Sequence, residues 1–169
     1  VTIKSEGVID ECIKSINQDL PIIIVENSNN SKFTNYLEKK YKNIRCVLSK
    51  KNLGMGSGNN LGIKEAKTDY VFIINPDVVL ENNTIDELIL ASENISDFSI
   101  LSPISSNINY PNYNIDEKQK KIKKENLPFS VNAVDGYAML FNKKKVDLIM
   151  SSESSNHKNN YFDESFFMY

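Results

Sequence analysis

The sequence predicts an α/β protein with a mostly parallel sheet and helices on both faces. Short apolar runs of strand length alternate with segments whose apolar residues recur at helical spacing. This alternation is typical of parallel sheets, because parallel strands are joined by helical crossovers. The 169 residues, 40% hydrophobic and 25% charged, are enough for one domain with a core of its own. We therefore expect residues 1–169 to form a single domain.

The expected elements follow from local patterns of apolar residues. Runs without polar alternation predict buried strands, and apolar residues three and four positions apart predict one face of a helix. The expected strands are residues 1–4 (the tail of a first strand), 21–25, 44–48, 70–74, 98–101, 131–134 and 137–141. The expected helices are residues 8–16, 33–41, a segment that opens at the glycines and ends near 67, 84–91 and 143–150.

Residues 105–128 differ from the rest of the chain. The segment is polar, contains two prolines, and includes a lysine-rich run at residues 118–124. Because it is long for a connection in a compact domain, we expect a functional flap or a mobile loop. The lysine run indicates a solvated helix face, with contact to phosphate or to an anionic membrane as the alternative.

Charge and composition exclude several classes of protein. A net charge of −2 argues against a general nucleic-acid surface. No apolar run approaches the roughly 20 residues that span a bilayer, and no signal peptide is visible at the start. Cys12 and Cys46 lack metal-ligand spacing, so we expect two reduced thiols. The expected location is the cytoplasm, either free or peripheral to the inner face of the plasma membrane.

A carboxylate follows the most apolar predicted strand. The run YVFII at residues 70–74 is followed by Asn75, Pro76 and Asp77, and Pro76 cannot continue a ladder of hydrogen bonds. Asp77 is therefore expected at the carboxyl edge of the sheet, where open α/β sheets bind ligands. Mg²⁺ or Mn²⁺, held there by Asp77 and by phosphate oxygens, would neutralise a diphosphate leaving group, and Asn75 could orient a metal-bound water or a ribose hydroxyl. The alternative is a turn that only caps the next helix.

A glycine-rich segment, NLGMGSGNNLG at residues 52–62, lies between a predicted strand and a predicted helix. Glycines let the backbone turn sharply and approach a ligand closely, and the free N–H groups of a helix start favour an anion. The spacing is not a strict G-x-G-x-x-G, and the Gly-Lys-Ser/Thr of a P-loop is lacking. The segment indicates a phosphate-binding turn, or alternatively a flexible turn capped by asparagines.

Two further acids lie beside predicted strands. Glu26 ends a strand expected at the same sheet edge, where its carboxylate could accept the imide N–H of uracil or thymine, or a ribose hydroxyl. A solvated acid at the start of a loop is the alternative. Asp135 precedes Gly136 between two apolar stretches. A buried acid in that position needs a partner, which favours a place facing the ligand edge.

Four segments, in order, resemble the family 2 glycosyltransferases with the GT-A fold, especially the rhamnosyltransferase-like branch. VENS at residues 25–28 resembles that family's V-D-N-x-S strand end, and residues 52–62 resemble its N-x-G-x-x-x-G-N-N-x-G segment. NPD at residues 75–77 resembles its version of the D-x-D motif. Residues 135–141 and 162–169 resemble its acceptor-side half, so that the likeness covers nearly the whole chain.

The resemblance implies a GT-A fold, which is Rossmann-like, and a metal-dependent, inverting glycosyltransferase. The enzyme would move a sugar from a UDP- or dTDP-sugar to a glycan or lipid-linked acceptor, such as a bacterial surface polysaccharide. Glu26 would contact the nucleobase, Asp77 the metal and diphosphate, and Asp135, the catalytic candidate, the donor sugar or the acceptor. The other residues expected to bind the donor nucleotide are Asn27, Asn52, Gly54, Asn59 and Asn75.

This sequence departs from the family pattern at two places. Glu26 stands where Asp is usual, so contacts with the base are expected to differ. The family's acidic pair, which includes the base that deprotonates the acceptor, follows its F-F-x-Y element. That base is therefore expected beyond Tyr169, and the chain is expected to be truncated at both ends.

Two other functions remain open from the sequence. One is a nucleotide-sugar-binding module without turnover, which the expected loss of the acidic pair favours. The other is an NAD-binding Rossmann dehydrogenase, because Asp77 follows the glycine turn by about 20 residues, as a ribose-binding acid would. Against the dehydrogenase, the glycines follow the third predicted strand and not the first.

Overall fold

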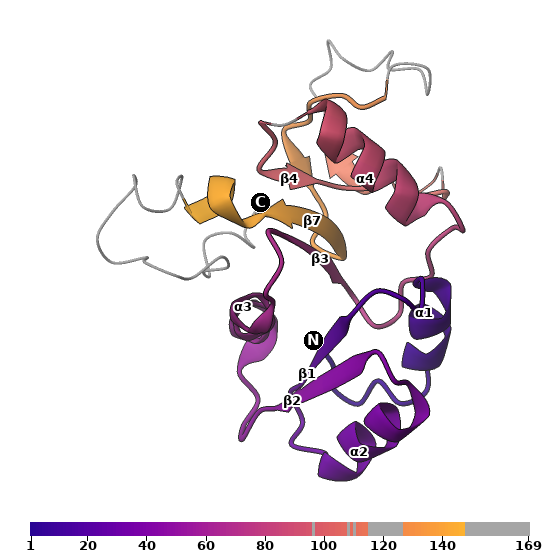
Figure 1. Ribbon diagram of the computed structural model, residues 1–169, viewed down its shortest axis with the longest axis vertical. Coiled ribbons are helices and arrows are strands. Elements are labelled where there is room, and N and C mark those ends of the chain that lie inside the picture. The colour runs from indigo at the N-terminus through magenta and orange to yellow at the C-terminus, as the bar shows by residue number, and fades with distance from the viewer. Residues whose placement is uncertain (96, 108, 110, 115–126, 148–169) are drawn as a thin grey trace.

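The computed structural model describes residues 1–95, 97–107, 109, 111–114 and 127–147 (Figure 1). Helices and strands alternate through the first half of the chain, as the sequence predicts. The helices are α1 (Ile9–Ser15), α2 (Ser31–Lys40), α3 (Gly54–Glu65) and α4 (Thr84–Asn94). The strands are β1 (Ile22–Glu26), β2 (Ile44–Leu48), β3 (Tyr70–Ile74), β4 (Ile100–Leu101), β5 (Tyr113–Asn114), β6 (Ala133–Val134) and β7 (Ala138–Asn142).

The N-terminal half is a parallel strand pair with helices on both faces. β1 and β2 pair in parallel, with Ile22 opposite Ile44. Ile24 packs with residues of α1 and α2, whereas Val25, the next residue, lies against Gly62 of α3. Since successive side chains of a strand point to opposite faces, α1 and α2 cover one face and α3 the other. The predicted two-sided cover is confirmed here (Figure 1).

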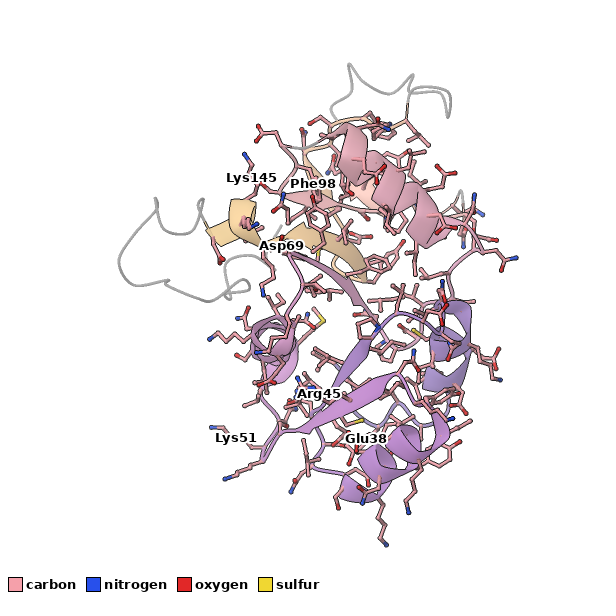
Figure 2. The ribbon with its side chains drawn as sticks, in the orientation of Figure 1. Glu38, Arg45, Lys51, Asp69, Phe98 and Lys145 are labelled. Carbon is pink, nitrogen blue, oxygen red and sulfur yellow. The ribbon has the colours of Figure 1, made fainter. Side chains whose placement is uncertain are left out.

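Both edges of this pair have partners beyond the two strands. Thr2 forms a single parallel bridge with Glu26, and the positive φ of 51° at Lys4 ends the extended segment. The predicted strand over residues 1–4 is therefore reduced to one paired residue. On the other edge, the Glu38 carboxylate of α2 accepts the Cys46 N–H at 2.7 Å (Figure 2). A charge on an edge strand discourages pairing with a second chain.

The C-terminal half contains a strand that runs against its neighbours. β7 lies between β3 and β4 and is antiparallel to both, so that β3 and β4 run parallel to each other. The reason lies in how the chain enters β7. The Asn75 N–H donates to the Tyr137 carbonyl at 2.8 Å, so β7 begins where β3 ends and must run back along it. The sheet is thus mixed at this point, whereas the sequence predicts a mostly parallel one.

β7 is the most buried strand, and all five of its residues are buried. Met139 and Phe141 pack with Ile63 of α3, whereas Leu140 packs with Leu88 of α4. The strand is therefore covered on both faces, which explains why its sequence shows no polar alternation. Together with the core around α1 and α2, these two clusters form the hydrophobic interior.

Several element boundaries differ from the predicted ones. β1 excludes Pro21, which has no N–H to donate, and includes Glu26. α4 extends to Asn94, and β4 and β6 are shorter than predicted. We expected residues 105–128 to be a loop or flap. β5 lies within this segment and pairs antiparallel with β6, which follows it. The side-chain amide of Asn112 ties this segment to the 102–105 backbone.

Some predicted features lie outside the described residues. These are the lysine-rich run at 118–124, the motif at 162–169 and the last residues of the helix expected over 143–150, of which 143–147 are helical. Both cysteines are free thiols; Cys12 is buried and Cys46 half-buried. Among the described helices, none combines the length and the apolar composition that crossing a bilayer requires.

Candidate functional site

Glu26 ends β1 as a fully buried acid. Its exposed fraction is 0%, and its carboxylate accepts hydrogen bonds from its own loop. Oε1 accepts from the N–H and the hydroxyl of Ser28, and Oε2 accepts from the Asn30 N–H at 2.7 Å. Asn30 in turn caps α2 by accepting the Phe33 N–H. The structure therefore places Glu26 at the predicted edge, with both oxygens engaged in shaping the turn into α2.

Asn27 joins the end of β1 to the glycine-rich loop. Its side chain is buried, with an exposed fraction of 2%. The Nδ2 group donates to Asn52 Oδ1 at 2.9 Å and to the Gly54 carbonyl at 3.2 Å. Oδ1 accepts from the Leu53 N–H at 2.9 Å and faces the Ser49 hydroxyl at 3.0 Å. The residues expected to bind a nucleotide at 27, 52 and 54 thus form one hydrogen-bonded cluster.

Gly54 begins α3 with a backbone that other residues rarely adopt. Its φ is +77°, and its N–H donates to Asn52 Oδ1 at 2.9 Å. A left-handed residue lets the chain turn from the exposed Asn52 into the helix within two positions. The predicted turn is confirmed, and the start of α3 faces the end of β1. Asn59, also expected at the site, is buried one turn further along α3.

The end of β3 forms the turn that the Asn-Pro-Asp sequence predicts. The Val78 N–H donates to the Asn75 carbonyl at 3.2 Å, which places Pro76 and Asp77 at the two central positions of the turn. Asp77 is exposed and Asn75 half-buried. The turn is fixed to α1, because the Cys12 thiol donates to the Asn75 carbonyl at 3.6 Å.

Cys12 is a buried neighbour of Asp77 that the sequence reasoning did not assign to the site. Burial raises the pKa of the Cys12 thiol to about 11, and the negative charge of Asp77 adds to this shift. The thiol therefore stays protonated at neutral pH and remains a hydrogen-bond donor. Its helical spacing indicates only a core position, so no signal in the sequence could have linked it to Asp77.

Asp135 lies at the same edge but is not buried. It is exposed, and its N–H donates to the Asn112 carbonyl at 2.8 Å. The expectation of a buried acid was wrong: Asp135 lies between β6 and β7, as predicted, but its side chain is exposed there. The hydrogen bond from the Asn75 N–H to the Tyr137 carbonyl sets the end of β3 beside the start of β7, so that Asp77, which follows β3, and Asp135, which precedes β7, lie beyond the same end of this strand pair. β3 and β7 thus bring the two predicted acids to one edge.

The predicted residues therefore form two groups at neighbouring strand ends. The first, held by Asn27, belongs to the N-terminal half, and the second, around Asp77, belongs to the C-terminal half. One small cavity lies between the first residues of β1 and the end of β3, and Thr2, Ile22, Ile74 and Pro76 are among the residues that line it. Ser49 belongs to the first group and was missed. A signal existed, since it is the first polar residue after β2, next to the register pair Glu26–Leu48.

The donor set at Asp77 fits a metal that arrives with its ligand. Within the described part of the chain, no group of three or more His, Cys, Asp or Glu side chains could hold a metal ion alone. A single exposed carboxylate is nevertheless sufficient for Mg²⁺ or Mn²⁺ when phosphate oxygens and water complete the coordination. Asp77, with Asn75 beside it, fits that arrangement and does not fit a closed structural metal site.

Comparison with known proteins agrees with this geometry. Residues 1–149 match the family model described as glycosyl transferase family 2. Over its whole length the chain is 28% identical to the low-salt glycan biosynthesis hexosyltransferase Agl10 of Haloferax volcanii and covers 56% of that protein. Over 97 residues it is 36% identical to the poly(ribitol-phosphate) beta-N-acetylglucosaminyltransferase TarP of Staphylococcus aureus, which is 56% of this chain and 29% of TarP.

Solved structures show the same fold. The crystal structure of S. aureus TarS residues 1–349 has a TM-score of 0.62 at 15% identity over 84% of this chain and 45% of that one. The mannosyltransferase PcManGT from Pyrobaculum calidifontis, in complex with GDP-Man and Mn²⁺, has a TM-score of 0.61 at 12% identity over 95% of this chain and 48% of that one. The expected GT-A fold is confirmed. The chain spans between 29% and 56% of the length of these relatives.

The family model covers most of the chain and includes every predicted residue of the two groups. Its limits also include β7, the strand that brings Asp135 to the edge. On this match, the chain belongs to glycosyl transferase family 2.

Proposed function

We propose that the protein is a metal-dependent, inverting glycosyltransferase that moves a sugar from a UDP- or dTDP-sugar to a glycan or lipid-linked acceptor. One observation carries the proposal. β3 leads into an exposed carboxylate, Asp77, and β7 starts beside the end of β3, so that a second exposed acid, Asp135, lies beyond the same end of the strand pair. Relatives support the reaction class, since Agl10 and TarP are named as sugar transferases, and TarS has been solved with UDP and with UDP-GlcNAc.

Each group of residues would take one part of the donor. Asn52 and the start of α3 would hold the nucleoside side, because exposed amide and backbone groups face outward there. Asp77 would bind Mg²⁺ or Mn²⁺ together with the diphosphate, and the cation would neutralise charge as the diphosphate leaves. Asp135 would lie beside the transferred sugar or the acceptor.

The finer assignments belong to the same proposal. The Asn-Pro-Asp turn supports the rhamnosyltransferase-like branch, and a surface polysaccharide is the proposed product. A lipid-linked acceptor would bring the protein from the cytoplasm to the inner face of the plasma membrane. Membrane contact would then use the lysine-rich run at 118–124, whose charge suits an anionic surface.

The proposal is tested by replacing the metal-binding carboxylate. We expect Asp77→Asn to lose metal-dependent stabilisation by UDP or dTDP while keeping its fold, because Asp77 is exposed in a turn. For the unaltered chain, nucleotide at about 100 times its Kd should raise the Tm by roughly 5–10 °C. The measurement is a thermal-shift panel of UDP, dTDP, GDP and NAD with Mn²⁺, Mg²⁺ or EDTA.

Asp69→Asn is the matched control. Asp69 precedes β3, at the end remote from Asp77, and forms an exposed ion pair with Lys144 (Figure 2). Its loss should change the response to nucleotide little, since exposed pairs contribute about 0–1 kcal/mol. Unchanged metal-dependent binding by Asp77→Asn would refute the role of Asp77. Stabilisation by NAD in EDTA would favour the dehydrogenase instead.

A further inference from the structure

The orientation of two side-chain amides in the first group is fixed by backbone atoms. The Gly54 N–H can only donate, so the atom of Asn52 that faces it must be Oδ1. The Gly54 carbonyl and Asn52 Oδ1 can only accept, so the atom of Asn27 that faces both must be Nδ2. The Leu53 N–H then meets Asn27 Oδ1, which agrees with this assignment. Rotating either side-chain amide by 180° would place a donor against a donor or an acceptor against an acceptor.

Asn27 has no donor left for a ligand, and its oxygen is enclosed. An asparagine amide has two N–H donors and two acceptor positions. Both donors are used, on Asn52 and Gly54, and Oδ1 accepts from the Leu53 N–H. The Ser49 hydroxyl lies 3.0 Å from the same oxygen, and its one hydrogen also faces the Lys51 carbonyl at 2.7 Å. The side chain is also buried, with 2% of its surface exposed. Asn27, which the sequence places among the nucleotide ligands, is therefore not placed to contact a nucleotide.

Asn52 is in the opposite situation. Its Oδ1 accepts from both Asn27 and the Gly54 N–H, which fills the two acceptor positions. The side chain is exposed, and the only polar atom not engaged by these bonds is Nδ2. With Oδ1 held inward, the two Nδ2 donors point to the outer side of the loop. Such donors suit an acceptor atom, such as a carbonyl of a pyrimidine base or an oxygen of the ribose or phosphate.

We propose that Asn27 is a positioning residue that holds the Asn52 amide with its donors outward, and that Asn52 in this orientation binds an acceptor atom of the donor nucleotide. The inference rests on the proposed function for the identity of the ligand. It goes further in assigning different roles to the two asparagines, Asn27 as a support and Asn52 as a ligand. It also predicts that a negative charge at the position of Asn27 Nδ2 lowers the affinity for the nucleotide.

Asn27→Asp tests the support, because it exchanges only Nδ2 for oxygen. Ionised, the new carboxylate opposes Asn52 Oδ1 and the Gly54 carbonyl, whereas protonated it can donate to one of them. We expect UDP affinity to fall roughly 10- to 100-fold at pH 8 and to recover as the pH falls through the pKa of the new carboxyl. Both affinities are measured by calorimetry with Mn²⁺ and compared as a ratio of variant to unaltered chain. Titration of UDP itself affects both affinities equally and therefore cancels in this ratio.

Asn29→Asp is the matched control for the added charge. Asn29 lies two positions further along the same turn, is exposed, and has a φ of +59° that aspartate tolerates. The ratio of its UDP affinity to that of the unaltered chain should not change with pH.

Asn52→Asp tests the ligand, since it keeps the oxygen that accepts from Asn27 and Gly54 and removes only the outward donors. We expect it to lose UDP affinity by a similar factor at pH 8, where the new carboxylate has no proton to donate.

A measurement without nucleotide separates this inference from the proposed function. In Asn27→Asp, the NMR shift of the Gly54 amide proton should titrate with the new carboxyl, because Gly54 donates to the displaced Asn52. Two results would overturn the role of Asn27. One is a Gly54 amide shift in Asn27→Asp that does not change with pH. The other is an affinity ratio that does not change with pH although the unaltered chain binds UDP normally. Failure of the unaltered chain to bind UDP or dTDP, with the Gly54 titration present, overturns the proposed function and the ligand role of Asn52.

Discussion

At the scale of single residues, a substitution at Gly54 tests backbone conformation alone, because the space around the residue is open. A Cβ at this position would meet no atom within 4 Å, so any cost of a side chain comes from the φ of +77°. We expect Gly54→Ala to lower the free energy of unfolding by roughly 1–2 kcal/mol and to weaken UDP binding, because the turn into α3 must open. Urea unfolding and calorimetry measure the two effects.

Gly7→Ala is the comparison for this change. Gly7 also has open space around its Cβ position, and its backbone is not left-handed. Its replacement should alter stability by no more than about 0.5 kcal/mol, as at other open surface positions. Equal effects of the two substitutions would contradict the conformational argument for Gly54.

The same scale shows where residue type is not enough to assign a role. Glu26 and Asn27 both follow the apolar run of β1, and the strand pattern correctly predicted that both would lie at the carboxyl end of this strand. It could not predict that their polar atoms would be used inside the protein, by Ser28 and Asn30 for Glu26 and by Asn52 for Asn27. Hydrogen-bond partners depend on the fold of two loops, which no local pattern encodes.

At the scale of elements, an ion pair joins α1 to α2. The Lys40 ammonium and the Tyr41 hydroxyl both donate to the Asp10 carboxylate, and the Lys40 hydrogen bond is the main cause that lowers the pKa of Asp10. A carboxyl whose pKa is lower in the folded state stabilises above its unfolded pKa, near 4, and loses that contribution as the pH falls. The pair should therefore add stability at neutral pH and none in strong acid.

Asp10→Asn checks this contribution. We expect the variant to lose about 0.2–1 kcal/mol near pH 7, the range of exposed pairs, and to match the unaltered chain in strong acid, where the pH lies below the lowered pKa of Asp10. Urea unfolding at both pH values gives the difference. Glu11→Gln removes a pair with Lys14 within α1 only, so its effect should be smaller. A loss that persists in acid would show that the Asp10 carboxylate acts through packing and not through charge.

Elements also show what periodicity can and cannot predict. Helical spacing correctly located α1 and α2, since each buries one apolar stripe against β1 and β2. The direction of β7 was not accessible in this way, because a strand buried on both faces has the same apolar sequence whether it runs parallel or antiparallel. Its direction follows from where the chain enters, at the hydrogen bond between Asn75 and Tyr137.

At the scale of the whole molecule, the candidate site straddles two halves with separate cores. The N-terminal half, around α1, α2, β1 and β2, supplies Asn52 and Gly54, and the C-terminal half, around β3 and β7, supplies Asp77 and Asp135 (Figure 1). α3 connects them, with Gly62 against Val25 and Ile63 in the core of β7. A ligand that touches both strand ends would therefore restrain both halves at once.

This arrangement predicts that metal decides how much of the molecule a nucleotide protects. In EDTA, UDP should slow amide hydrogen exchange mainly around residues 49–56, because the nucleoside side lies in the N-terminal half. With Mn²⁺, protection should extend to residues 74–78 and 134–138, because the cation links the diphosphate to Asp77. Asp77→Asn should restrict protection to the first segment even with Mn²⁺. Equal protection of both halves by UDP in EDTA would contradict the division of the site, since the diphosphate would then reach β3 without a metal.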